Sequence, residues 1–326
     1  MKKILTLCLS AGIQKTIEFS NIQLDKVNRS QNYRFDIAGK AVNSSRVFAQ
    51  LAEKIENLSK DKIKENITLI CPLGEKNIDF WRDLSQIENF NQKNVLIPGF
   101  TRECCTLIES ETGRVTELVV EEPKIQDANK SQKTKEILDL LKAELSENHK
   151  NSFEKPVALL VAGSVPSYWD SNIMTEIAKI AKNQNVLLMA DFKGKTLRSL
   201  IPEYCPEIIK INEEEFLETF YPEKMGQDSS IYDTILPELI SQKSDELQNI
   251  IIVTRGEKDT ILGFQGKILV EKTEKVSIKN TIGCGDAFNA GFLYEYTLSG
   301  NLEKALKMGT YAASRNAENL APGCIF

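Results

Sequence analysis

Six short runs of apolar and β-branched residues recur along the chain, and they constrain its fold more than any other feature. The runs are apolar on both faces, as strands buried in a parallel sheet must be. They are ILTLCL (4–9), ITLIC (67–71), VALLVAG (157–163), VLLMAD (186–191), EIIKI (207–211) and IIIVT (250–254). Between several of them, apolar residues repeat at helical spacing, as at 42–55, 137–145 and 173–180. This alternation predicts an α/β fold with a doubly wound, mostly parallel sheet that is flanked by helices.

Two segments, residues 13–37 and 94–121, break this pattern because polar and apolar residues alternate along them. Alternation is typical of strands with one solvated face, and Thr112-Gly113 predicts a hairpin turn. We interpret the two segments as a small β-sheet lid on a single domain, residues 1–326. The α/β core then comprises residues 1–12, 38–93 and 122–326. The alternative is that the two segments form an antiparallel edge of the main sheet.

The overall charge and the cysteine pattern exclude several classes of protein. Lys and Arg total 41 against 46 Asp and Glu, a net charge of −5, which argues against a general nucleic-acid binder. None of the seven cysteines forms a C-x-x-C pair, so we expect reduced thiols and no zinc site. No apolar stretch approaches the roughly 20 residues of a membrane span. The apolar run near the N-terminus, about six residues, is shorter than a secretory signal requires. We expect a cytoplasmic protein without nucleic-acid or membrane partners.

The segment NTIGCGDAF, residues 280–288, carries the strongest chemical signal. Gly283 and Gly285 allow the backbone to approach a ligand closely. Free N–H groups at the start of the helical pattern that follows make a site for an anion. Asp286 lies at that position, where it can take a proton from a hydroxyl group. The structural alternative is a glycine turn with Asp286 as the N-cap of the helix.

This segment resembles the signature D-T-x-G-x-G-D-x-F of the ribokinase-like (PfkB) family of carbohydrate kinases, with Asn280 as the only departure. The resemblance implies an ATP-dependent kinase of ribokinase-like fold in which Asp286 is the catalytic base. It also implies that the backbone of Gly283, Cys284 and Gly285 stabilises the γ-phosphoryl group during transfer. Further motifs follow in family order, so the resemblance covers essentially the whole chain.

Two of these motifs lie on the nucleotide side. Residues 210–215, KINEEE, resemble the family's K-x-N-x-x-E motif. The resemblance implies that Lys210 and Asn212 bind the nucleotide and that Glu215, with Asn212, organises Mg²⁺ and its waters, an arrangement that suits this reluctantly dehydrated ion. Thr254 and Gly256, in the segment TRG, match the family's nucleotide-side turn. Taken alone, the run of three glutamates is better interpreted as a solvated helix start.

Other motifs lie on the substrate side. Residues 38–43, AGKAVN, resemble the family's G-G-K-G-x-N motif, which implies substrate-binding roles for Gly39, Lys40 and Asn43. Arg29 and Arg102 match segments of the 1-phosphofructokinase and tagatose-6-phosphate kinase branch. There, matching arginines and a lysine like Lys40 hold the phosphate already on the sugar, because a planar guanidinium group makes paired hydrogen bonds to phosphate oxygens.

Gln14 is the main departure from the family pattern. The family's first strand typically ends in a motif such as N-P-A-x-D, whose Asp binds sugar hydroxyls, whereas residues 10–14 of this chain read SAGIQ. A glutamine is neutral and offers one accepting oxygen and a donating NH₂ group. We expect Gln14 to contact the substrate, in a way that changes either the specificity or the activity.

Several function classes compete with a kinase. A dinucleotide dehydrogenase is disfavoured because Phe288 stands where a third glycine is required, and a P-loop NTPase because Met189 stands at the leading glycine position before GKT, residues 194–196. His149 is the single histidine and lies in the polar stretch SENHKN, where we expect a solvated loop, so Ser-His or Cys-His catalysis is poorly supported.

The rival interpretation is a catalytically weak or inactive relative that binds a sugar phosphate or acts as a regulatory protein. We expect a sugar-phosphate kinase that uses ATP and Mg²⁺ and whose lid can pair two subunits in a homodimer.

Overall fold

A large, mostly parallel sheet forms the centre of the computed structural model, which describes residues 1–122, 127–146, 155–226 and 229–326. Nine strands pair in the order β13-β12-β11-β10-β9-β8-β1-β4-β5. Their bounds are β1 Ile4–Leu7, β4 Ile67–Gly74, β5 Asn91–Ile97, β8 Ala158–Ala162, β9 Leu187–Asp191, β10 Ile208–Asn212, β11 Ile250–Arg255, β12 Lys258–Phe264 and β13 Lys267–Glu271. The strands from β11 to β5 are parallel, while β12 and β13 add an antiparallel edge. All six strands that the apolar runs predict are present, which confirms the α/β sheet.

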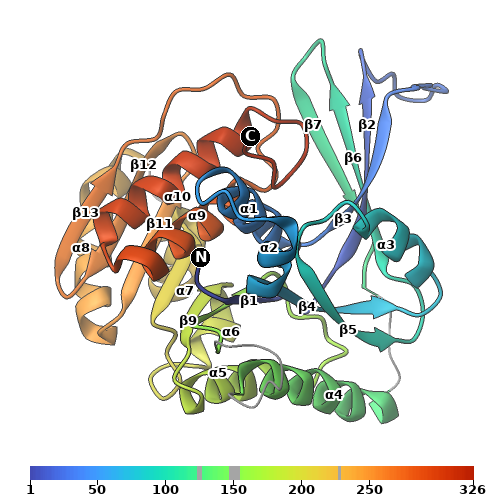
Figure 1. Cartoon of the computed structure of the whole chain (residues 1–326). Coiled ribbons are helices and arrows are strands. Elements are labelled where there is room, and N and C mark those ends of the chain that lie inside the picture. The colour runs from blue at the N-terminus through green and yellow to red at the C-terminus, as the bar shows by residue number, and fades with distance from the viewer. Residues whose placement is uncertain (123–126, 147–154, 227–228) are drawn as a thin grey trace.

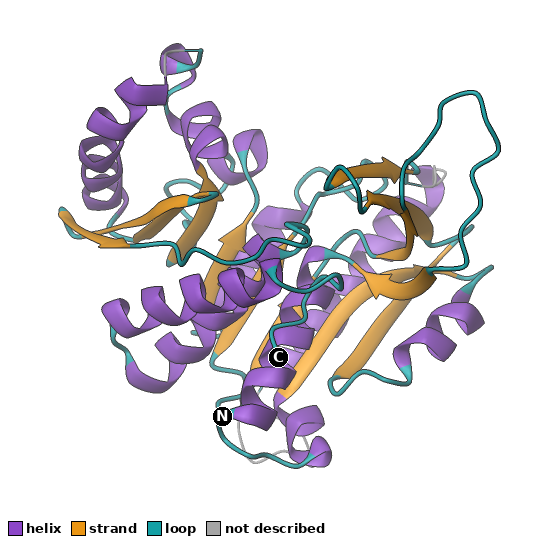
Figure 2. Ribbon diagram, turned by 90° about the horizontal axis from the view of Figure 1, so that it is seen from above, coloured by secondary structure: helices purple, strands orange, loops and turns teal. Residues whose placement is uncertain are grey.

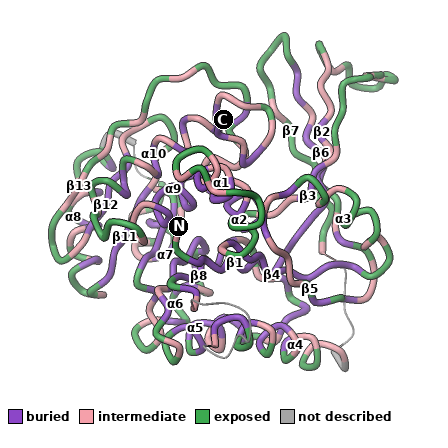
Figure 3. Tube along the Cα trace, viewed as in Figure 1, coloured by how far each residue is buried: buried purple, intermediate pink, exposed green. Residues whose placement is uncertain are grey.

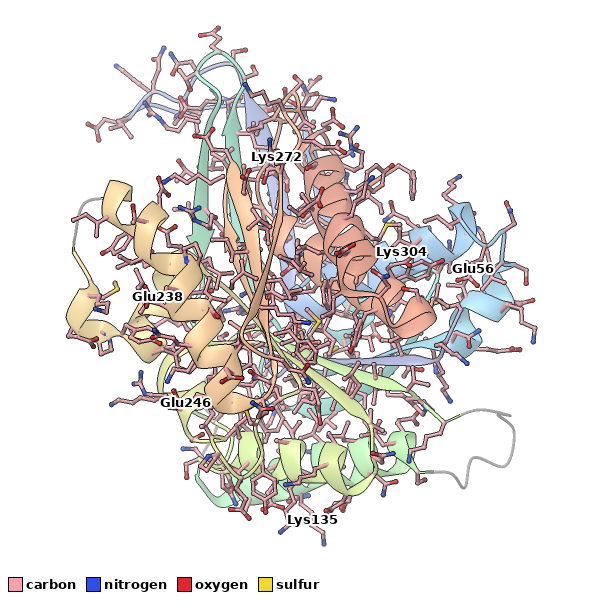
Figure 4. All side chains as sticks on the ribbon, turned by 90° about the vertical axis from the view of Figure 1, so that its left-hand side faces the viewer. Glu56, Lys135, Glu238, Glu246, Lys272 and Lys304 are labelled. Carbon is pink, nitrogen blue, oxygen red and sulfur yellow. The ribbon has the colours of Figure 1, made fainter. Side chains whose placement is uncertain are left out.

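Helices cover both faces of this sheet (Figure 2). One face packs against α1 (Lys40–Lys54), α2 (Lys60–Asn66), α9 (Cys284–Ser299) and α10 (Leu302–Ala317), and the other against α4 (Asp127–Leu145), α5 (Ile173–Asn183), α6 (Gly194–Arg198), α7 (Glu213–Phe220) and α8 (Ser229–Leu247). A further helix, α3 (Ile78–Ser85), buries Trp81 beside the first group, and a short 3₁₀ turn spans Pro222–Lys224. The strands are buried between two hydrophobic cores (Figure 3). Lys135, Glu238 and Glu246 are exposed on α4 and α8 (Figure 4).

The lid is a separate four-stranded sheet that projects from the core (Figure 1). Its strands are β2 (Gly12–Phe19), β3 (Tyr33–Ala38), β6 (Arg102–Glu109) and β7 (Arg114–Val119), paired in the order β3-β2-β6-β7. Gly113, at a φ of 68°, lies in the turn between β6 and β7, where the sequence predicts a hairpin. Apart from residues 94–97, the two segments therefore form the lid and not an edge of the main sheet.

The expected boundary at residue 94 is too early, because β5 belongs to the main sheet. This strand pairs in parallel with β4, and the register runs from Thr68 opposite Asn91 to Gly74 opposite Ile97. Its apolar residues alternate because only one face of this edge strand is covered. Val95 and Ile97 pack into the core, whereas Leu96 is exposed. An edge strand covered on one face and a lid strand share the same alternating pattern. Of the helices in the described ranges, none is long and apolar enough to cross a bilayer.

Candidate active site

A cavity of about 430 Å³ lies where the carboxyl ends of the central strands meet the base of the lid. Open α/β sheets bind their ligands at this edge, because loops and helix N-termini converge there. Asp191, Asn212 and Thr254 line the cavity from the ends of β9, β10 and β11. Besides Asn212 and Thr254, the residues predicted for the site that line it are Gln14, Gly39, Lys40, Asn43, Arg102, Lys210, Glu215, Gly283, Gly285 and Asp286. Motifs that lie far apart in the sequence therefore share one cavity.

Asp286 lies in the first turn of α9, with 6% of its surface exposed. Its Oδ2 accepts a hydrogen bond from Nδ2 of Asn43, 2.8 Å away on α1. Its backbone carbonyl accepts a second bond, from Oγ of Ser44 at 2.9 Å. The N-cap of α9 is Gly283, so the alternative role of Asp286 as the N-cap does not apply. The carboxylate is oriented by another helix and faces the cavity.

The surroundings of Asp286 favour a proton acceptor that works near neutral pH. Burial above all, together with the carboxylate of Asp191, raises the pKa of Asp286 from its ordinary value of 3.8 to about 6. The ammonium group of Lys40 and the hydrogen bond from Asn43 oppose this rise in pKa. A general base is most effective when its pKa lies close to the working pH. The site therefore suits the removal of a proton from a hydroxyl group.

Asp191, a residue that the motifs did not indicate, holds two lysines in the cavity. Its side chain is 1% exposed. Its Oδ1 lies 3.1 Å from Nζ of Lys40, and its Oδ2 lies 3.4 Å from Nζ of Lys210 and 2.6 Å from Nδ2 of Asn289. Burial acts to raise the pKa of Asp191, but the two lysines prevail and lower it below the ordinary value. The only signal in the sequence is a carboxylate at the end of the apolar run VLLMAD.

The loop before α9 depends on its glycines. Gly283 has a φ of 83°, and a Cβ there would lie 3.0 Å from Cβ of Pro322. A Cβ at Gly285 would lie 2.7 Å from Nζ of Lys210. Cys284 does not line the cavity: its Sγ accepts from Nδ2 of Asn316 at 3.4 Å, and its backbone N–H donates to Thr281 at 3.3 Å. The N–H groups that follow, in the first turn of α9, have no acceptor within the helix and can bind an anion.

Asn212 and Glu215 form a capping box at the start of α7. Oδ1 of Asn212 accepts from the backbone N–H of Glu215 at 2.8 Å, and Oε2 of Glu215 accepts from the backbone N–H of Asn212 at 3.0 Å. This pairing satisfies two donors at the helix start. Both side chains also line the cavity, so the structural and the ligand-binding interpretations of this motif are compatible.

Besides Cys284, two predicted residues, Gly256 and Arg29, lie outside the cavity. Gly256 has a φ of 64° in the turn between β11 and β12 and does not line the cavity. Arg29 lines two shallow hollows on the lid, among residues 15–20 and 28–33, rather than the cavity. Arg102 does line the cavity, and its Nε lies 3.2 Å from Oε1 of Glu122. His149 lies outside the described residues.

Known proteins match this arrangement along nearly the whole chain. The family model described as pfkB family carbohydrate kinase matches residues 6–322. A 1-phosphofructokinase from Borreliella burgdorferi is 27% identical over 314 residues, which cover 96% of this chain and 91% of that relative. The structure of phosphofructokinase-2 from Escherichia coli in complex with fructose-6-phosphate has a TM-score of 0.79 at 17% identity, covering 99% of this chain and 96% of the other. A ribokinase from Thermotoga maritima has a TM-score of 0.64 at 17% identity, over 99% and 95% of the two chains.

Proposed function

Because this chain belongs to the pfkB family of carbohydrate kinases, we propose that it transfers the γ-phosphate of ATP to a hydroxyl of a phosphorylated sugar, as a 1-phosphofructokinase or a tagatose-6-phosphate kinase does. The family makes it a phosphotransferase with an alcohol group as acceptor and ATP as the donor. The observation that carries the proposal is the buried Asp286, oriented by Asn43 and facing a cavity with two lysines. The relative from Borreliella burgdorferi supports the choice of a sugar phosphate.

The protein forms no covalent bond to the phosphoryl group in this proposal, because phosphoryl transfer depends mostly on positioning and charge stabilisation. Asp286 accepts the proton of the attacking hydroxyl. Lys40 and Lys210, held by Asp191, balance negative charge that develops on the phosphoryl oxygens. The first N–H groups of α9 bind the same oxygens. The lid covers the cavity and excludes water, which limits wasteful hydrolysis of ATP.

We propose that Mg²⁺ accompanies the nucleotide at Glu215 and Asn212. In the described ranges no three His, Cys, Asp or Glu side chains come together as a metal site. Mg²⁺ does not require such a group, because it keeps several waters and takes one or two carboxylates together with substrate phosphates. Glu215 supplies one carboxylate that lines the cavity, so the residues present fit a hydrated ion. When bound, the ion would neutralise phosphate charge.

The pKa of Asp286 predicts the pH dependence of the reaction. Only the ionised carboxylate can accept a proton, and its pKa is raised to about 6. We expect kcat/KM for the sugar to rise with pH up to about 6 and to level off above it, because this ratio reports the ionisation of the free enzyme. Initial rates in buffers of constant ionic strength measure the profile. A profile that stays flat between about pH 5 and 8 contradicts the assignment of the base.

A substrate screen tests the proposed function directly. Phosphoryl transfer from ATP is measured on fructose 1-phosphate, fructose 6-phosphate, tagatose 6-phosphate and the unphosphorylated sugars, with calorimetric binding of the same compounds in parallel. We expect turnover with at least one sugar phosphate and much weaker turnover with the free sugars. Binding without turnover would instead support the inactive, sugar-phosphate-binding alternative. Asp286, Gly283 and Gly285 are all retained, which favours a kinase over the inactive alternative although Gln14 departs from the family pattern.

We further propose that two chains associate through their lids. Tyr33 on β3 and Leu118 and Val119 on β7 are 52–60% exposed, although all three are apolar or aromatic. Exposed apolar strands at a sheet edge are suited to pairing with a second subunit. Sedimentation velocity is expected to give a dimer, and Leu118→Glu is expected to shift it toward the monomer. A monomer at every concentration of the parent protein would contradict this arrangement.

We also propose a cytoplasmic location. All seven cysteines are free thiols, as expected in a reducing compartment. Fractionation of the host cells tests this location.

A further inference from the structure

Gln14 and Asp36 lie opposite each other in the lid. They are register partners in the antiparallel pair β2–β3. Their side chains therefore leave the sheet on the same face, with Cβ atoms about 4.5–5.5 Å apart. Both line the cavity that contains Asp286, and only 6% and 8% of their surfaces are exposed. An amide and a carboxylate thus meet at the lid end of the cavity.

Hydrogen bonds within the lid determine what this pair can offer a ligand. Nε2 of Gln14 donates to Oγ1 of Thr106 at 2.6 Å. The amide NH₂ group is therefore engaged within the lid, and the amide oxygen is left to accept a hydrogen bond from a ligand. Oδ2 of Asp36 accepts from Nε of Arg34 at 2.7 Å, and Oδ1 accepts from Nη2 of the same arginine. A carboxylate has about four acceptor positions, so two remain after these bonds. The pair presents acceptor oxygens to the cavity.

Charge decides which part of a ligand can lie against these oxygens. A buried carboxylate repels a phosphate group and attracts hydroxyl donors. Glu117 lines the same cavity from β7 and adds a second negative charge. The ammonium groups of Lys40 and Lys210 lie instead beside Asp191, at the ends of the central strands. Arg102 also lines the cavity, from β6 opposite Gly12, so a phosphate of the substrate is favoured beside Arg102 and its hydroxyl groups beside Gln14 and Asp36.

We propose that Asp36 is a specificity-determining residue, which accepts hydrogen bonds from substrate hydroxyls together with Gln14. The inference rests on the proposed function and deepens it. The substrate must present neighbouring hydroxyl groups toward the lid while another hydroxyl faces Asp286. Asp36 selects such a polyol because a hydroxyl-poor ligand leaves its remaining acceptor positions unpaired, which is costly in a buried site.

Asp36→Asn tests the role of the carboxylate with little change in shape. We expect KM for the sugar phosphate to rise about 10- to 100-fold, the range for losing hydrogen bonds to a charged acceptor. The KM for ATP and kcat are expected to stay within a few-fold, since Asp286 and the lysines are untouched. Arg34→Gln is the matched control: it removes the ion pair but keeps the carboxylate. If Asp36 only paired with Arg34, the two variants would raise KM equally, and the proposal would fail.

The double variant Gln14→Asp, Asp36→Asn returns a carboxylate to the pair from the opposite strand. We expect it to recover at least part of the lost kcat/KM, which a purely structural role of Asp36 would not allow. Thermal melting of every variant establishes that each is folded. A parent that phosphorylates none of the sugar phosphates overturns the proposed function, and this inference with it. An active parent whose Asp36→Asn variant has an unchanged KM for the sugar overturns the inference alone.

Discussion

Replacement of Asp286 by asparagine is expected to lower kcat by about 10²- to 10⁴-fold, the range for loss of a general base. Asparagine has nearly the same shape, and its amide oxygen can still accept the bond that Nδ2 of Asn43 donates at 2.8 Å to the parent carboxylate. What is lost is the ability to take a proton from the acceptor hydroxyl. Steady-state kinetics with the sugar phosphate identified by the screen measure the effect.

Asp61→Asn is the matched control for this variant. Asp61 also lies in the first turn of a helix, α2, but its side chain is exposed and does not line the cavity. Its replacement is expected to leave kcat unchanged, and the KM for ATP is expected to change little in both variants. Turnover of the Asp286→Asn variant within a few-fold of the parent would show that another group accepts the proton.

Asp191→Ala is expected to cost about 3–5 kcal/mol of the free energy of unfolding, as does removal of one partner of a buried ion pair. Asp191 is 1% exposed and Lys210 is 5% exposed, so the variant leaves an ammonium group in the interior without its counter-charge. Urea unfolding measures the loss. Glu218→Ala is the control, because its pair with Lys193 is 46–47% exposed and such surface pairs contribute about 0–1 kcal/mol.

The pH dependence of this loss has a definite sign. Folding lowers the pKa of Asp191 below its ordinary value of 3.8. A carboxyl of lowered pKa stabilises the folded state above its unfolded pKa, and that stability is lost as the pH falls through the folded pKa. The difference between parent and variant is therefore expected to be full at neutral pH and to shrink below pH 3.8. A loss as small as that of Glu218→Ala at neutral pH would contradict the buried network.

The elements of the core could be predicted because each depends on a local pattern. The run VLLMAD is apolar on both faces, and a short run of this kind is typical of a strand covered on both sides. The turn at Gly283 and Gly285 was predictable for the same reason. Gly283 has a φ of 83°, a backbone conformation that residues other than glycine rarely adopt. By contrast, the alternating residues of β5 could not be assigned to a sheet, because alternation records one solvated face and not the partner strand.

Six core strands, several helices and the chemical type of the residues at the strand ends follow from the sequence, as does Asp286 as the candidate base. Which of these side chains meet depends on how distant segments pack together. Asn43 contacts Asp286 across 243 positions of the chain, and Lys40 contacts Asp191 across 151. The raised pKa of Asp286 follows from burial and from Asp191, neither of which has a local signature. Periodicity records which face of an element is buried, whereas electrostatic coupling depends on distances that arise only when distant segments pack together.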